Sequence, residues 1–189
     1  MVALMALHAL ELVLDDASDA LIRAEWEALA RAGLPSQARH TGLTNAPHVT
    51  VVAAPENPAD VEAFAVERLG PLLPLPVELA GIVLLGRGPY AFARLLEPNA
   101  ALGDAVRAIR GRVPHPHSPG WTAHLTLARR LCPEQVGPAI AAVATGAAAP
   151  RHVVVAGLRR WDPDAGERGA VRLLAGAAAP EAKRPDCER

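Results

Sequence analysis

The sequence predicts one α+β domain built from two similar halves. Hydrophobic residues make up 51% of the 189 residues, enough for a core of ordinary size. Short apolar runs of strand length alternate with segments of helical periodicity, and turn residues separate them. Cutting the chain near residue 75 gives two comparable runs, each with one His-x-Thr strand. We therefore expect a single domain over 1–179, with approximate halves 1–75 and 76–179 whose sheets face each other across a groove.

The first half is expected to contain a strand, a helix, a second strand and a second helix. In order, these elements cover residues 7–14, 15–32, 48–54 and 58–69. Asp15 offers an N-cap for the first helix, and Gly33 follows its end. The side chains of Leu21, Trp26 and Leu29 are expected to lie near one face of this helix.

The second half is expected to contain two strands, a helix, a strand, a short helix and a final hairpin. In order, these elements cover residues 77–85, 90–98, 99–111, 122–129, 133–146, 152–161 and 169–176. Asn99 caps the first of these helices, which has helical spacing at Leu102, Val106 and Ile109. The tail over 180–189 is polar and is expected to be disordered.

The balance of charge excludes a protein that coats long stretches of nucleic acid. The net charge is −1 and the sequence pI is about 6.7, whereas such binding requires a large basic surface that neutralises phosphates. Recognition of a single phosphate or of an RNA end remains compatible with this composition.

The cysteines and the N-terminus favour a cytoplasmic protein. Cys132 and Cys187 have no metal-ligand spacing, and a disulfide framework is not expected. The segment MVALMALHALELVLDD lacks a basic start and indicates a buried strand rather than a signal peptide. No apolar stretch is as long as a membrane span.

Two strand-like segments, HVTVV and HLTLA, share one pattern. Because side chains alternate along a strand, each puts its His and Thr on one face and aliphatic residues on the other. The polar faces are expected to hold His48, Thr50 and Val52 in the first, and His124, Thr126 and Ala128 in the second. Either pattern alone fits a polar pair at a sheet edge. Chance predicts about 0.3 such patterns in this composition, so their pairing favours a functional site.

Two opposed imidazoles suit in-line displacement at phosphorus. One neutral ring takes a proton from the attacking water or hydroxyl, and the other, as imidazolium, gives a proton to the departing oxygen. Attack and departure occur on opposite sides of phosphorus, so the two rings must face each other. Threonine hydroxyls can donate to the non-bridging oxygens. This chemistry needs no metal and no cofactor.

The paired motifs, HVTV at 48–51 and HLTL at 124–127, resemble the signature of the two-histidine phosphoesterase superfamily. Within it, the chain is most similar to the 2′-5′ RNA ligase-like branch, also described as RNA 2′,3′-cyclic phosphodiesterases. The resemblance covers most of the chain up to about Gly176. It implies a bilobal, pseudo-twofold α+β fold, with two antiparallel sheets facing a central groove and helices outside.

The resemblance also implies roles for individual residues. His48 and His124 would be the catalytic acid–base pair, and Thr50 and Thr126 would bind the substrate phosphate. Arg129 extends the second motif as HLTLAR and becomes a further candidate phosphate contact. Simple alternation, however, puts Arg129 on the wrong face and Arg130 on the right one, unless a bulge reverses them.

Several alternatives remain open at the level of sequence. The loop HPH at 115–117 could bind a metal, but no carboxylate or cysteine joins it, and we expect it to cap the groove. The aromatic residues that could stack on a base, with core packing as the default, are Tyr90, Phe92, Trp121 and Trp161. Arg159 and Arg160, next to Trp161, could line an RNA path, but they are expected on a solvated hairpin.

The two candidate functions are a metal-independent phosphodiesterase and a binding module. The first acts on RNA 2′,3′-cyclic phosphate ends or 2′-5′ linkages, and reversible 2′-5′ ligation is the same chemistry run backwards. The second holds a nucleotide or RNA end with little turnover. Expected partners are RNA ends, short oligonucleotides or cyclic nucleotides. A monomer without an obligate protein partner or membrane contact is expected.

Overall fold

The computed structural model describes residues 7–40, 42, 45–144, 151–165 and 169–176. The predicted tail over 180–189 and Cys187 lie outside these residues. The strands are β1 (His8–Leu14), β2 (His48–Ala54), β3 (Leu75–Leu85), β4 (Tyr90–Glu97), β5 (His124–Leu131), β6 (His152–Asp162) and β7 (Ala170–Gly176). The α-helices are α1 (Asp16–Arg31), α2 (Ala59–Leu69), α3 (Ala100–Arg110) and α4 (Val136–Ala144). Short 3₁₀ turns cover Gln37–Arg39, Gly70–Leu72 and Pro133–Gln135.

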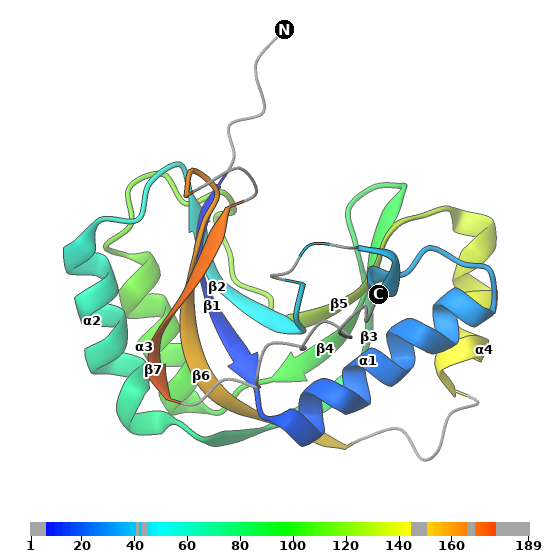
Figure 1. Ribbon diagram of the computed structural model, residues 1–189, viewed down its shortest axis with the longest axis horizontal. Helices are drawn as coiled ribbons and strands as arrows, with labels where there is room; N and C mark the ends of the chain where they lie inside the picture. Colours follow the sequence, from blue (N-terminus) through cyan, green and yellow to red (C-terminus); the bar gives the residue numbers. More distant parts are fainter. Residues whose placement is uncertain (1–6, 41, 43–44, 145–150, 166–168, 177–189) are drawn as a thin grey trace, which may run out of the picture.

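The strands form one antiparallel sheet in the order β2-β1-β6-β3-β4-β5, with β7 added beside β6. This order is symmetric about its centre, because β2 and β1 mirror β5 and β4 (Figure 1). The predicted α+β class with antiparallel strands is confirmed. The two halves, expected as separate sheets, are joined where residues 75–78 of β3 pair with residues 152–155 of β6. This pairing also explains why β3 begins two residues before the predicted strand.

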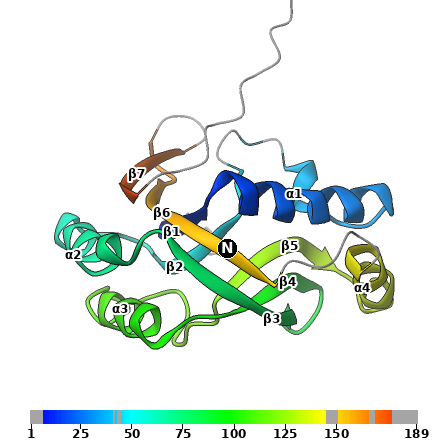
Figure 2. The same ribbon diagram turned by 90° about the horizontal axis from the view of Figure 1, so that it is seen from below.

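The helices are exchanged between the two halves. Helix α1 follows β1 in the chain but packs beside β5 and α4, whereas α3 follows β4 and packs beside β2 and α2 (Figures 1 and 2). Each motif strand is therefore supported by a helix from the other half. The positions of β2 and β5 therefore depend on packing between the two halves.

Helix α1 begins as its sequence predicts, but one residue of its predicted face is wrong. The Asp15 side chain accepts a hydrogen bond from the Ser18 backbone N–H at 2.8 Å. Trp26 and Leu29 are buried as expected, whereas Leu21 is 44% exposed and Ile22 is fully buried in its place. Positions 22, 26 and 29 follow the i, i+4, i+7 spacing of one helical face, which position 21 does not.

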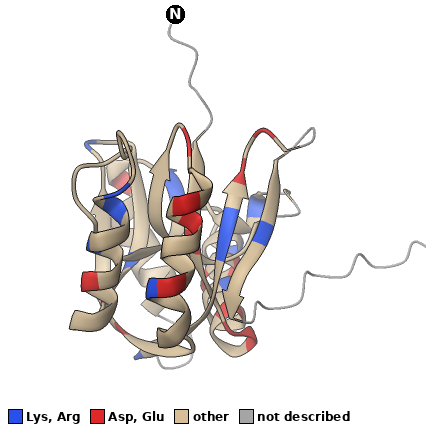
Figure 3. Cartoon of the chain, turned by 90° about the vertical axis from the view of Figure 1, so that its left-hand side faces the viewer, with Lys and Arg blue, Asp and Glu red and all other residues tan. Residues whose placement is uncertain are grey.

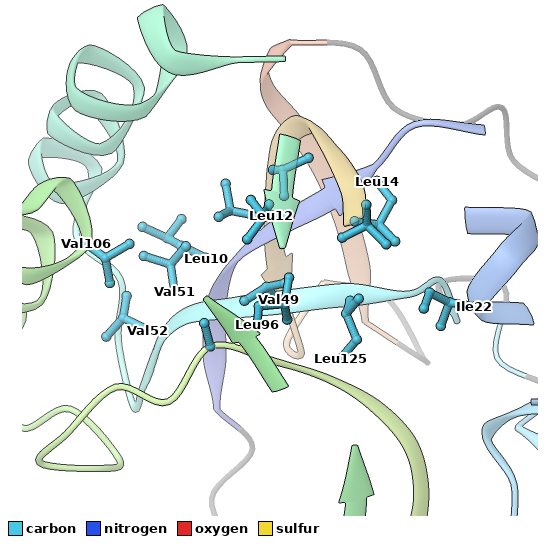
Figure 4. Close-up of a cluster of buried hydrophobic side chains, with 14 of the residues drawn as sticks. Leu10, Leu12, Leu14, Ile22, Val49, Val51, Val52, Leu96, Val106 and Leu125 are labelled. Atoms are coloured by element: carbon cyan, nitrogen blue, oxygen red, sulfur yellow. The ribbon is translucent and has the colours of Figure 1, made fainter. Parts of the chain in front are cut away.

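One hydrophobic core connects the two halves. Val49 of β2 and Leu125 of β5, the residues directly after the two histidines, belong to the same buried cluster (Figure 4). Both are almost completely buried, at 3% and 1% exposure. Burial of each such aliphatic side chain contributes about 1.5–3 kcal/mol. The motif strands are thus held by their apolar face, which leaves the opposite face for the histidines.

The surface carries both signs of charge. Acidic and basic positions are interspersed over the helices and strands of the side drawn in Figure 3. This distribution agrees with the absence of a strong net charge in the sequence. Among the described residues, no helix combines the length and the apolar character needed to cross a bilayer.

Candidate active site

The four motif residues lie on β2 and β5, the two ends of the symmetric strand order, and these two strands contact each other. Their side chains are partly exposed, while the aliphatic residues between them are buried. The residues concerned are His48, Thr50, His124 and Thr126. The predicted alternation between a polar and an apolar face is therefore confirmed within both motifs.

A β-bulge directly follows the first motif threonine. Glu11 of β1 pairs with Thr50 and Leu10 pairs with Val52, so Val51 is an extra residue on β2. Val51 and Val52 are both fully buried. The expectation that Val52 shares the polar face of Thr50 is wrong, because the bulge turns it toward the core.

The second motif has a bulge at the equivalent position. Ala93 of β4 pairs with Thr126 and Phe92 pairs with Ala128, which leaves Leu127 as the extra residue on β5. Leu127 and Ala128 are both fully buried. The placement of Ala128 on the polar face is therefore also wrong. Both halves therefore carry an extra residue directly after the motif threonine.

Arg129 and Arg130 follow the second bulge on β5. A further register shift follows Ala128, because residues 129 and 130 of β5 both lie opposite Ala91 alone, so alternation does not separate Arg129 from Arg130. Both Arg129 and Arg130 are exposed, and Arg130 has a positive φ of 60°. The role of Arg129 as a phosphate contact stays a prediction. The matching position in the first half, Ala53, carries no charge.

Both histidine rings are oriented by the same local contact. Nδ1 of His48 lies 2.8 Å from the carbonyl oxygen of Ala46, and Nδ1 of His124 lies 2.7 Å from that of Thr122. Because a carbonyl oxygen only accepts, Nδ1 must carry the proton in both rings. Nε2 is therefore the atom that each ring offers for proton transfer.

Two tryptophans from outside the motif strands hold the motif backbones. The indole N–H of Trp121 donates to the carbonyl oxygen of Thr50 at 2.8 Å, and that of Trp26 donates to Thr126 at 3.0 Å. On an edge strand, the carbonyl groups that point away from the neighbouring strand otherwise lack a ladder partner. Each motif threonine is consequently tied at its backbone by an indole.

A buried ion pair lies beside His48. Glu11 Oε2 accepts a hydrogen bond from Nε of Arg159 at 2.8 Å, and Glu11 Oε1 lies 3.4 Å from Nε2 of His48. Glu11 is 6% exposed and Arg159 is 9% exposed. Sequence reasoning did not identify Glu11 as part of the site. Its signal is a lone carboxylate within the apolar run HALELVL.

The expected solvated character of Arg159 and Arg160 is wrong. Arg159 is buried against Glu11, and Arg160 forms ion pairs with Glu62 of α2 and with Asp162. Both side chains are held by carboxylates from neighbouring elements. Arg160 therefore anchors helix α2 to the sheet.

The loop that contains HPH lies along the outer edge of β2. The backbone N–H of His117 donates to the carbonyl oxygen of Ala53 at 2.8 Å. Nη1 of Arg110 donates to Val51 O at 3.1 Å, and its Nη2 donates to carbonyl oxygens of residues 118 and 120. Burial lowers the pKa of Arg110 from its ordinary value. Arg110 thus fastens this loop to the first motif strand.

The aromatic candidates for base stacking have different environments. Phe92 is fully buried and belongs to the core, as the default interpretation expected. Tyr90, Trp121 and Trp161 are partly exposed. Trp121 also lines a cavity of about 480 Å³ between α3 and the loop 116–121, whose lining contains no motif histidine.

In the described part of the chain, one group of side chains has the spacing of metal ligands, and it does not include His115 or His117. It consists of His8, Asp162 and Asp164. Nη2 of Arg160 lies 3.3 Å from Nδ1 of His8 and 3.1 Å from Asp162 Oδ2. A fixed positive charge there opposes a cation, so these contacts are better explained as an ion-pair network.

Comparisons with known proteins identify the family and the fold of this chain. Residues 17–167 match the model of the 2′-5′ RNA ligase superfamily. A search of curated proteins found no match. Among solved structures, the chain is similar to E. coli LigT complexed with 3′-AMP, at 15% identity and a TM-score of 0.51, over 92% of this chain and 96% of that one. It is also similar to a protein described as a phosphoesterase, at 16% identity and a TM-score of 0.51, over 92% and 98%.

At these identities the structural likeness shows the fold alone, a LigT-like fold with one antiparallel sheet and four helices in the described residues. The family match shows more than the fold, because it spans most of the chain and includes both motif strands. The family suggested by the paired motifs is confirmed: this chain belongs to the 2′-5′ RNA ligase superfamily of two-histidine phosphoesterases.

Proposed function

We propose that this protein is a metal-independent phosphodiesterase. It opens 2′,3′-cyclic phosphate ends of RNA to 2′-phosphates, or cleaves 2′-5′ linkages, by acid–base catalysis with His48 and His124. Reversible 2′-5′ ligation would use the same groups, with a ribose hydroxyl in place of water. Membership of a superfamily of phosphoesterases supports the reaction class.

One observation carries the proposal: the two histidines have the same local chemistry at matched positions of two matched halves. Each Nδ1 is tied to the carbonyl oxygen two residues earlier, and each ring precedes a threonine and a bulge. This arrangement leaves two Nε2 atoms for proton transfer. Pure binding of a phosphate would not require an imidazole on each of the two strands.

In the proposed reaction, one Nε2 removes a proton from water as the oxygen attacks phosphorus. The other Nε2 donates its proton to the ribose oxygen that leaves on the opposite side. The hydroxyls of Thr50 and Thr126 donate to the non-bridging oxygens, where negative charge develops. Arg129, which extends the second motif and is exposed, provides a guanidinium for the same phosphate.

The proposed substrates are RNA ends, short oligonucleotides or cyclic nucleotides. LigT of E. coli, which shares the fold, has been crystallised with 3′-AMP. The mixed surface charge of this chain favours recognition of one phosphate end over a long nucleic-acid path. We therefore expect affinity to depend on the terminal phosphate more than on chain length.

The alternative is a module that binds a nucleotide or RNA end with little turnover. The two functions differ in their dependence on pH. Catalysis by one neutral and one charged imidazole predicts a bell-shaped profile, in which the rate falls at low pH as the base is protonated and at high pH as the acid is deprotonated. A binding module would show no turnover at any pH.

A substrate screen without added metal tests the proposal. The probes are 2′,3′-cyclic AMP, GMP, CMP and UMP, together with 2′-5′-linked and 3′-5′-linked dinucleotides as a matched pair. We expect turnover of the cyclic compounds or of the 2′-5′ linkage, with a 2′-phosphate as the product of ring opening. Tight binding of these compounds without any turnover would contradict the proposal and favour the binding module.

A further inference from the structure

A cavity of about 480 Å³ lies between helix α3 and the loop over 116–121. Helix α3 packs beside α2, at the end of the molecule opposite α1 and α4 (Figures 1 and 2). The lining of the cavity contains neither a motif histidine nor a motif threonine, so it is separate from the candidate active site. Its volume falls within the range of about 300–1,000 Å³ that is typical of small-molecule sites.

Two glycines line the cavity at positions where packing does not require glycine. Gly103 lies inside helix α3, where glycine lowers the stability of a helix relative to alanine. A Cβ atom added at Gly103 or at Gly120 would meet no neighbouring heavy atom within 4 Å, and neither residue has a positive φ. Neither close packing nor backbone conformation accounts for these glycines. Their missing side chains leave the cavity open.

The charge of the lining is positive. Its charged residues are Arg107 and Arg110, and it contains no carboxylate. Arg107 pairs with Asp104 at the surface, whereas the Nη atoms of Arg110 donate to neutral carbonyl oxygens. Burial lowers the pKa of Arg110 from its ordinary value, as expected for a charge without an acidic partner. An anion is the ligand that this lining favours.

The apolar part of the lining consists of rings. Trp121 is partly exposed and contributes an indole, and three prolyl rings come from Pro98, Pro116 and Pro119. Indole faces stack on nucleobases, and this stacking is tolerant of the identity of the base. Proline and tryptophan have few rotamers, so little side-chain entropy is lost when a ligand binds. The ligand that fits this part of the cavity has a flat ring.

Hydrogen bonds to β2 hold the charge and the indole in place. The indole N–H of Trp121 donates to the carbonyl oxygen of Thr50, and Nη1 of Arg110 donates to that of Val51. The Nε atom of Arg110 takes no part in its contacts with carbonyl oxygens. The cavity wall is therefore attached to two consecutive residues of the first motif strand. Such a wall is formed before any ligand arrives.

We propose that this cavity is a second site, which binds a nucleoside monophosphate. Arg107 and Arg110 interact with the phosphate, and the base stacks on Trp121 among the prolyl rings. The site goes beyond the proposed phosphodiesterase function, because binding there uses neither His48 nor His124. The same chemistry is presented by a free nucleotide and by a nucleotide within an RNA chain.

Calorimetric titration of the full-length protein with AMP tests the site. Adenosine and inorganic phosphate are the comparison ligands, since each offers only half of the required chemistry. We expect AMP to bind at least about tenfold more tightly than either of them, because it uses the arginines and the indole together. An affinity for phosphate equal to that for AMP would overturn the role of the indole.

Gly103→Leu fills the cavity, and Gly137→Leu is its matched control. Gly137 lies in helix α4, and a Cβ atom added there also meets no heavy atom within 4 Å. Both changes replace a helical glycine by a better helix former, so neither variant should unfold at a lower temperature than wild type. We expect Gly103→Leu to weaken AMP binding in the cavity by at least about tenfold, and Gly137→Leu to leave it unchanged. Any AMP bound at the active site remains as a separate binding event in Gly103→Leu.

A second pair of variants tests the charge. Arg107→Gln removes one guanidinium from the lining, and we expect the Kd of AMP in the cavity to rise about fivefold. Arg68→Gln is the control, because Arg68 is exposed on the neighbouring helix α2 and does not line the cavity. Its Kd should equal that of wild type. Equal values for both variants would overturn the phosphate contact.

A pentanucleotide of adenylate separates the two sources of the ligand. A cavity that takes a free nucleotide binds the pentanucleotide and AMP with equal affinity, which we expect because the lining includes no motif residue. A cavity that takes one nucleotide of a bound RNA binds the pentanucleotide at least about tenfold more tightly than AMP. Gly103→Leu then loses this gain.

The remaining outcomes are distinct. An undetectable affinity of wild type for AMP, or an unchanged affinity in Gly103→Leu, overturns the second site. Loss of cyclic-nucleotide turnover in Gly103→Leu also overturns it, because the cavity would then belong to the active site. A wild type that binds AMP in the cavity but turns over no cyclic or 2′-5′-linked substrate contradicts the proposed function and supports the second site.

Discussion

The indole Nε1 of Trp121 donates a hydrogen bond to the carbonyl oxygen of Thr50 at a distance of 2.8 Å. Trp121 lies in the loop before β5, so a residue next to the second motif holds the backbone of the first. The reverse contact, from Trp26 to the carbonyl of Thr126, comes from helix α1. Both contacts act between segments that are far apart in the chain, and both end on a motif threonine.

Replacement of Trp121 by Phe should disturb this link with little change of shape. Loss of a hydrogen bond to a partly buried carbonyl costs about 1 kcal/mol, which corresponds to a fall in Tm of about 2–4 °C for a chain of this size. We also expect kcat to fall several-fold, since the position of Thr50 relaxes. Calorimetry and steady-state kinetics on one preparation measure both effects.

Trp161→Phe is a suitable comparison for Trp121→Phe. Trp161 is partly exposed on β6 and is a candidate for base stacking, so its replacement is expected to change KM and to leave kcat, which depends on the position of Thr50, unchanged. If Trp161→Phe and Trp121→Phe lower kcat equally, the hydrogen bond to Thr50 has no particular role.

The motif threonines should contribute less to turnover than the histidines. Thr50→Val and Thr126→Val each remove one donor to the non-bridging oxygens, and we expect a loss in kcat of about tenfold with little change in Tm. Both side chains are partly exposed, so the hydroxyl is not needed for packing. Single-turnover kinetics would check this, and a loss as large as that of a histidine variant would contradict the assigned role.

Arg129 should contribute to binding of the phosphate. Arg129→Gln is expected to raise KM about tenfold for a cyclic nucleotide, because a guanidinium contact to phosphate is lost. Arg87→Gln, in the exposed turn between β3 and β4, provides the matched control and should leave KM unchanged. Equal KM values for the two variants would remove Arg129 from the site.

Chelation should leave activity intact. The proposed chemistry gives both proton transfers to imidazoles, so dialysis against EDTA is expected to change kcat/KM by less than about twofold. The ion-pair network of His8, Asp162 and Asp164 provides a further check, because Asp164→Asn should also leave activity unchanged. A strict requirement for an added divalent ion would contradict the account and direct attention to His8 or to the HPH loop.

Local patterns predicted most of the elements and the two motifs. Caps such as Asp15 and Asn99 mark helix starts through contacts within three residues, and both hydrogen bonds are present. The alternation of side chains along a strand, which exposes His48 and His124, also depends only on neighbouring residues. These features could be predicted because the interactions that produce them are local in the chain.

The bulges and the ion pair could not be predicted in this way. Whether Val51 or Leu127 becomes an extra residue depends on the register with β1 or β4, which no local pattern determines. Glu11 and Arg159 are 148 positions apart. Glu11 is visible as a lone charge within an apolar run, and Arg159 as the first of two consecutive arginines at the end of another, but only the order of strands in the sheet brings the two together.

The central claim is that His48 and His124 share the proton transfers of one phosphodiester reaction. The most direct measurement is kcat/KM for a 2′,3′-cyclic nucleotide in His48→Ala and His124→Ala, with circular dichroism to show that each variant folds. We predict a loss of about 100-fold or more in each variant, with wild-type secondary structure. Near wild-type activity in either folded variant would contradict the claim.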